Sequence, residues 1–107
     1  MILCDTSVYF EIFRGNEQVI EEVGKIGFGN LAICDLSVGE IYFGMRKGEQ
    51  RKTKELIDLF QRFHFTKEVS KAFIEIMTNR YGRRIQIPDA LVASFAKANS
   101  RIIYAQC

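Results

Sequence analysis

Residues 1–10 of the chain read MILCDTSVYF, an apolar run followed at once by Asp5, Thr6 and Ser7. The same order returns in residues 31–38, LAICDLSV, where Asp35 follows the apolar run. Apolar runs of this length are typical of strands that are buried on both faces of a parallel sheet. Each acid then either caps a following helix or faces a positive group.

Amphipathic segments separate the apolar runs. The spacing of apolar residues predicts helices that begin at Ser7, at Glu17, at Asp35 or Ser37, at Arg51, at Lys67 and at Pro88. The helix at residues 51–63 is followed by HFT, residues 64–66, as a short third strand, and Gly82 is a candidate C-cap. RIIYAQC, residues 101–107, begins another apolar strand. This alternation predicts an α/β fold with a parallel sheet.

The composition is that of a globular protein with one core. The chain has 107 residues, of which 48% are hydrophobic, and a net charge of +2, which permits an anionic partner without arguing for one. No apolar run approaches the roughly 18–20 residues that a membrane-spanning helix needs, and no signal peptide is evident. We expect a cytoplasmic protein without a membrane partner, in which Cys4 and Cys34 are reduced and packed inside strands.

Four acids are candidates for chemistry: Asp5, Asp35, Glu40 and Asp89. Parallel strands bring their carboxyl ends, and the acids that follow them, to one edge of the sheet. Simpler roles compete with this interpretation, because Asp5 and Asp35 can cap helices and Asp89 suits the first turn of a helix. Glu40 can lie on a solvated helix face, but its neighbours are apolar and a buried carboxylate needs a partner. We expect Asp35 to be a cap.

Clustered carboxylates repel one another, and hard divalent cations relieve that repulsion. Such a group of acids suits metal-assisted attack of water on a phosphodiester. Competing signals are weaker: His64 lies between phenylalanines, and most of the nine phenylalanines have core spacing and do not resemble a base-stacking platform. The basic run from Arg46 to Lys54 is better explained as a solvated helix face than as a contact with an RNA backbone.

Three motifs resemble the PIN-domain family, and in particular the VapC-type ribonuclease toxins of toxin–antitoxin pairs. They are MILCDTS at the start, S-x-x-E-I-x-x-G in residues 37–44, and IPDALVA in residues 87–93. The resemblance implies a three-layer α/β/α sandwich with about four parallel strands, in one PIN-like domain over residues 1–107. It also implies that Asp5, Glu40 and Asp89 match the acids that hold Mg²⁺ or Mn²⁺ and carry out catalysis. The implied partners are RNA, a small cognate antitoxin and a second copy of the chain.

The sequence departs from the family pattern at two places. Ser7 stands where the family usually has asparagine. Tyr104 and Gln106 stand about where the family has Thr-x-Asn-x-x-Asp, so the fourth acid would fall past Cys107 and the domain is C-terminally short. The resemblance thus predicts a Mg²⁺-dependent endoribonuclease toxin, in which side chains such as Arg46 or Lys47 hold the RNA. The alternative is a weak or inactive PIN-like module that binds an antitoxin or a like subunit.

Overall fold

A four-stranded parallel sheet lies at the centre of the protein. The computed structural model describes residues 1–79, 84–100 and 102–105. The strands are β1 (Ile2–Cys4), β2 (Leu31–Cys34), β3 (Gln61–Phe63) and β4 (Ile103–Ala105), in the order β3-β2-β1-β4. Ile2 pairs with Leu31 on one side and with Ile103 on the other. Because the pairs are parallel, the carboxyl ends of the strands lie along one edge, called here the carboxyl edge.

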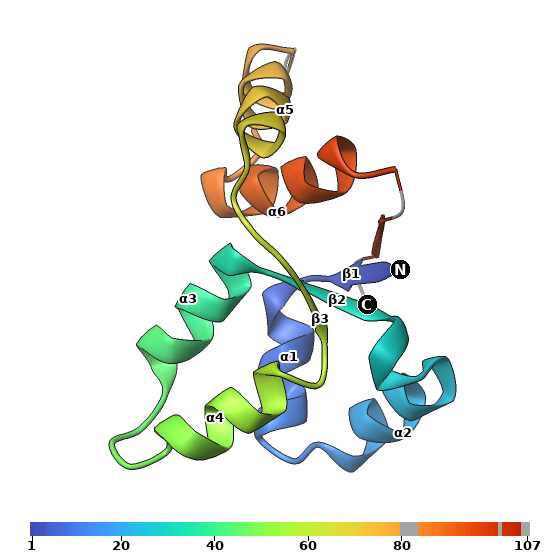
Figure 1. Ribbon diagram of the computed structural model, residues 1–107, viewed down its shortest axis with the longest axis vertical. Coiled ribbons are helices and arrows are strands. Elements are labelled where there is room, and N and C mark those ends of the chain that lie inside the picture. The colour runs from blue at the N-terminus through green and yellow to red at the C-terminus, as the bar shows by residue number, and fades with distance from the viewer. Residues whose placement is uncertain (80–83, 101, 106–107) are drawn as a thin grey trace.

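The two central strands are apolar throughout because each face of the sheet is covered by helices. Side chains alternate along a strand, so Leu31 and Ile33 enter the core on one face while Ala32 and Cys34 enter the core on the other. Both Cys4 and Cys34 are buried, as the sequence predicts. The helices form an outer layer on each side of the sheet (Figure 1). The predicted three-layer α/β/α architecture is therefore confirmed.

Four helices cover the first face: α1 (Thr6–Phe13), α2 (Glu17–Ile26), α3 (Asp35–Gly44) and α4 (Gln50–Ile57). A short 3₁₀ turn, η1 (Phe28–Asn30), leads from α2 into β2. Asn16 caps α2 by accepting from the backbone N–H groups of Gln18 and Val19. Gly27 ends α2 with a φ of 93°, which a residue with a side chain rarely adopts.

The second face is covered by α5 (Lys67–Thr78) and α6 (Ile87–Ala98), which pack against each other. Thr66 caps α5 by accepting from Val69 N, and Pro88 lies in the first turn of α6, where its missing N–H costs nothing. Val69, Val92 and Phe95 form this core together with Leu3 from β1.

Two predicted elements differ from the structure. The helix expected over residues 51–63 ends at Ile57, and the third strand is Gln61–Phe63 instead of residues 64–66. Leu59 is 51% exposed, so it does not continue the apolar face of α4. The apolar residues of this segment are spaced as in a helix, but residues 61–63 pair with β2 and form a strand instead. Gly82, Gln106 and Cys107 lie outside the described residues.

None of the helices within the described ranges has the length and apolar character needed to cross a membrane.

Candidate active site

Asp5 occupies the turn between β1 and α1 at the carboxyl edge. Its backbone is extended and in the N-cap position of α1, but its side chain accepts no capping bond within the described part of the chain. Instead, Ser7 Oγ donates to Asp5 Oδ2 over 3.1 Å. The buried Tyr9 fixes this turn against the sheet, because its hydroxyl accepts from Cys4 N and donates to Ala32 O. The simple capping role for Asp5 is therefore not what the structure shows.

Glu40 lies on α3 and is joined to the first turn of α1. Thr6 Oγ1 donates to Glu40 Oε1 over 2.9 Å and lies 2.8 Å from Ser37 Oγ. Thr6 is 7% exposed and Ser37 is fully buried, so both hydroxyls need partners inside the protein. Ser37 and Glu40 are three residues apart on one side of α3. The carboxylate of Glu40 is thereby held beside the residue that follows Asp5.

The acceptor at the end of this network determines which hydroxyl donates to which. An ionised carboxylate can only accept, so the Thr6 proton goes to Glu40, and the Thr6 oxygen must accept the proton of Ser37. Ser37 Oγ in turn lies 3.5 Å from Cys34 Sγ. Burial raises the pKa of the Cys34 thiol, which therefore keeps its proton and can donate it. A one-way series of donors thus runs from Cys34 to Glu40 and orients the carboxylate.

Asp89 lies on a different element from Asp5 and Glu40. It is an exposed residue in the first turn of α6, where the helix dipole favours an anion. Helix α6 contacts α3, and its first turn lies above the start of α3 at the carboxyl edge (Figure 1). The structure therefore brings Asp5 and Glu40 together through Thr6, with Asp89 on the neighbouring helix.

The chemistry of these acids fits Mg²⁺ or Mn²⁺, because carboxylate oxygens are the ligands that both ions prefer. In the ranges that the structure covers, no group of three or more His, Cys, Asp or Glu side chains stands close enough to hold an ion. Mg²⁺ usually keeps several waters and binds through one or two carboxylates together with substrate phosphates. Asp5 and Glu40, at the start of α1 and on the neighbouring α3, are the candidate carboxylates for such a site, and Asp89 is a further candidate.

Asp35 is not the helix cap that the sequence predicts. It is the first residue of α3, and it accepts from Arg62 Nε over 2.9 Å and from Phe65 N over 3.3 Å. His64 Nδ1 lies 3.1 Å from Asp35 Oδ2. Burial alone would raise the pKa of Asp35, but the hydrogen bonds from Arg62 and His64 outweigh it and lower that pKa. Asp35 therefore anchors the end of β3 to the start of α3.

An open groove of about 500 Å³ runs beside Glu40 and is called here the aromatic groove. It is lined by Phe10, Asp35, Leu36, Gly39, Glu40, Phe43, Gly44 and Phe65. Phe43 is 94% exposed and Phe65 is 54% exposed. These two rings are exceptions to the predicted packing of phenylalanines in the core.

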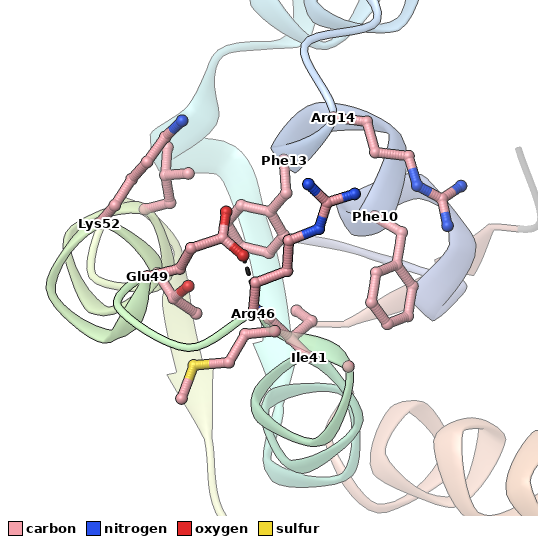
Figure 2. A pocket seen from close by; sticks show the side chains of 11 residues that line it. Phe10, Phe13, Arg14, Ile41, Arg46, Glu49 and Lys52 are labelled. Atoms are coloured by element: carbon pink, nitrogen blue, oxygen red, sulfur yellow. Dashed lines mark hydrogen bonds between the residues drawn. The ribbon is translucent and has the colours of Figure 1, made fainter.

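A second hollow, of about 610 Å³, lies between α1, α3 and α4 (Figure 2). Phe10, Phe13 and Ile41 contribute apolar surface to the lining of this hollow. Charged side chains line it too: Arg14, Arg46, Glu49 and Lys52. The Arg14 guanidinium lies 5.8 Å from the centre of the Phe10 ring. Arg46 N donates to Glu49 Oε1, a bond that holds the turn between α3 and α4.

The hydrogen-bond network behind Glu40 is not predicted from the sequence. Ser37 was expected only as a possible helix cap, and no role was predicted for Thr6 or Tyr9. The spacing of Ser37 and Glu40 by three residues was the available signal, since it puts both on one side of a helix. The partner, Thr6, is 34 residues away from Glu40 in the sequence, so only the fold reveals the pair.

Comparison with known proteins gives matches at the level of family and fold. The family model "PIN domain" matches residues 2–103. A comparison with curated proteins gave no match.

Among solved structures, a toxin–antitoxin complex from Klebsiella pneumoniae has a TM-score of 0.80 and 17% identity over 97% of this chain and 83% of that one. FitAcB from Neisseria gonorrhoeae has a TM-score of 0.77 and 23% identity over 94% and 83%. VapBC2 from Rickettsia felis, bound to a promoter DNA fragment, has a TM-score of 0.72 and 18% identity over 99% and 98%. At these identities the structural matches show a shared fold, and with the family match over almost the whole chain they show that the protein belongs to the PIN-domain family.

Proposed function

We propose that this chain is a Mg²⁺- or Mn²⁺-dependent endoribonuclease toxin of the VapBC type, formed by one PIN-like domain over residues 1–107. The observation that carries the proposal is the hydrogen bond that holds Glu40 against Thr6, the residue that follows Asp5 at the carboxyl edge. The family match and the fold shared with toxin–antitoxin structures support it.

In this proposal, Asp5, Glu40 and Asp89 hold the divalent cation and are the catalytic residues. A bound cation of this kind activates water and neutralises negative charge on a phosphodiester. The protein contributes the fixed orientation of Glu40, set by Thr6 and Ser37. Exposed basic side chains such as Arg46 and Lys47 supply contacts for the RNA backbone.

The first experiment measures cleavage of labelled RNA by the purified chain with Mg²⁺ and with EDTA. We expect Asp5→Asn, Glu40→Gln and Asp89→Asn each to lower the rate by at least about 100-fold, because each removes a charged group from the reacting centre. The same variants should no longer inhibit growth when expressed.

Glu21→Gln is the matched control, because Glu21 is an exposed acid on α2, on the opposite side of α1 from the start of α3. It should cleave as the unmodified chain does. Each variant is purified in the same way, so a contaminating nuclease would give equal rates in all samples. Full activity in Asp5→Asn and Glu40→Gln, with the fold intact, would contradict the assignment.

A non-catalytic PIN-like module is the second candidate. The observation in its favour is that the described residues contain no ready group of three or more metal-binding side chains. This candidate predicts a folded chain that cuts no RNA with Mg²⁺ or Mn²⁺ but still binds its protein partner.

The partner in either case is proposed to be a small antitoxin, by analogy with the toxin–antitoxin complexes that share the fold. The hollow in Figure 2 suits a segment that carries apolar and acidic side chains, because Phe10 and Phe13 line it and its basic residues outnumber its one acid, Glu49. A second copy of the chain is a further proposed partner. We place the protein in the cytoplasm, where the buried Cys4 and Cys34 would remain reduced.

A further inference from the structure

The aromatic groove exposes two rings beside the proposed catalytic acid. Phe43 follows Glu40 by three residues on α3, so the two side chains lie on the same side of that helix. A ring that is 94% exposed gains nothing from burial in the fold. Exposed apolar surface that adjoins a polar site is typical of a binding surface.

Phe65 forms a second, fixed wall of this groove. Its ring packs against Phe95, with 5.2 Å between the ring centres and 54° between the planes. Its backbone N–H donates to Asp35 Oδ2. The ring is therefore held in place before any ligand arrives, which lowers the entropy that binding must overcome.

Two hydrogen-bond donors adjoin the groove at Asp35, one of the residues that line it. Arg62 donates to Asp35 through Nε, and its two terminal amino groups make no hydrogen bond within the described part of the chain. Its side chain is 44% exposed. His64 faces Asp35 with Nδ1 and is 67% exposed. The Arg62 charge offsets that of Asp35, so the repulsion of a phosphate by Asp35 is reduced.

We infer that the aromatic groove is a subsite for single-stranded RNA, in which a base stacks on Phe43 with Phe65 as the second wall, and the adjoining phosphate contacts Arg62 and His64. The inference rests on the proposed ribonuclease function and adds how the substrate is held. Aromatic faces accept any base, and basic groups beside them follow the backbone, which is the usual combination in proteins that bind single strands. The position of Phe43 would place a neighbouring phosphodiester at Glu40. A protein segment is the less favoured occupant, because Arg62 and His64 adjoin the groove and can contact a phosphate, and Phe43 lies three residues from the proposed catalytic Glu40.

The test measures the affinity of a fluorescein-labelled single-stranded oligonucleotide of RNA, by anisotropy, in a Glu40→Gln background that prevents cleavage. Phe43→Leu keeps an apolar side chain but removes the π face, so we expect binding to weaken about 10-fold. Phe43→Trp keeps the π face and should bind at least as well as the parent. Because the chain contains no tryptophan, this variant also carries a single fluorophore, whose emission a stacked base should quench. Leu59→Ala, which removes an exposed apolar side chain in the turn between α4 and β3, is the control and should bind like the parent.

Each result has a definite meaning. Equal affinity in Phe43→Leu and the parent, without quenching in Phe43→Trp, would overturn the subsite while RNA cleavage by the unmodified chain left the proposed function intact. Failure of the unmodified chain to bind or cleave any RNA with Mg²⁺ would instead overturn the proposed function, and the subsite with it. Loss of self-association or of antitoxin binding in Phe43→Leu, with RNA affinity unchanged, would assign the groove to a protein partner and overturn the inference.

Discussion

The hydroxyls of Thr6 and Ser37 give Glu40 its orientation. Both side chains are buried and their protons run in one direction, so the network has one low-energy arrangement while Glu40 is ionised. Such groups do not touch the substrate. They position Glu40, which does, and a change in the orientation of its carboxylate is expected to lower the rate of RNA cleavage.

Replacement of Thr6 by valine tests this positioning role. Valine has the same shape without the hydroxyl, so Glu40 loses its donor and Ser37 loses its acceptor. We expect cleavage to fall by about 10-fold, in keeping with the loss of one hydrogen bond to a charged group. The kcat/KM of RNA cleavage measures the effect.

Thr6→Ser is the matched control, because it restores the hydroxyl and should recover most of the rate. Circular dichroism checks the fold of both variants. Equal rates for Thr6→Val and the unmodified chain would show that the network serves stability alone.

For single residues, the places of Asp5 and Glu40 in the fold were easier to predict than the hydrogen-bond partners of the acids. The apolar runs correctly put Asp5 after β1, and helical spacing put Glu40 on α3. Asp35 was misassigned because an acid before a helix has the same local pattern whether it caps that helix or binds a distant partner. Its partners Arg62 and His64 lie 27 and 29 residues further along the chain.

Among the elements, strands with buried faces were the easiest to predict. β1 and β2 are apolar at every position because helices cover both sides. β3 was harder, since it is an edge strand whose residues Gln61 and Arg62 are exposed, and its identity comes from pairing with β2. Asp35, in the first turn of α3, joins this helix to β3 by accepting a hydrogen bond from Arg62.

The lowered pKa of Asp35 makes this junction sensitive to acid. A carboxyl group whose pKa is lower in the folded than in the unfolded chain stabilises the fold above its unfolded value of 3.8, and that contribution is lost as the pH falls through the folded value. We expect Asp35→Asn to lower the free energy of unfolding by about 1 kcal/mol at pH 7, and to show a smaller further loss than the unmodified chain when the pH drops to about 3. Urea denaturation at the two pH values measures both effects.

Asp58→Asn is the control for this comparison. Asp58 also forms an ion pair, with Lys54 at 2.9 Å, but its side chain is 58% exposed. Exposed pairs contribute little, so this variant should stay within about 0.5 kcal/mol of the unmodified chain at pH 7. An unchanged stability in Asp35→Asn would contradict the anchoring role.

In the whole molecule, the parallel topology decides where function can lie. Strand ends that are distant in the sequence meet at the carboxyl edge, and helices α1, α3 and α6 each begin there (Figure 1). The sequence predicted this edge from two repeated stretches. It did not predict the strand order or the contact between α3 and α6, because both depend on packing between distant segments.

The aromatic groove and the hollow of Figure 2 share Phe10 and Gly44, so ligands of the two surfaces would be neighbours.

Binding of a divalent cation should stabilise the whole fold. A cation that binds only the folded chain adds about 2.7 kcal/mol at 100 times its Kd, and it relieves the repulsion between carboxylates. We expect Mn²⁺ to raise the Tm by several degrees, measured by scanning calorimetry, and both Asp5→Asn and Asp89→Asn to lose most of that shift.

Glu21→Gln should keep the full Mn²⁺ shift. A shift that survives in Asp5→Asn and in Asp89→Asn alike would place the cation elsewhere on the molecule.

The interior position of Cys34 has a consequence for the chemical durability of the protein. A thiol reacts with oxidants or alkylating agents as an exposed thiolate. Cys34 is fully buried in a central strand, and its raised pKa keeps it protonated. The first donor in the series that ends at Glu40 is thus shielded from oxidation for as long as α5 and α6 cover this face of the sheet. Oxidative damage at this position would follow the separation of these helices from the sheet.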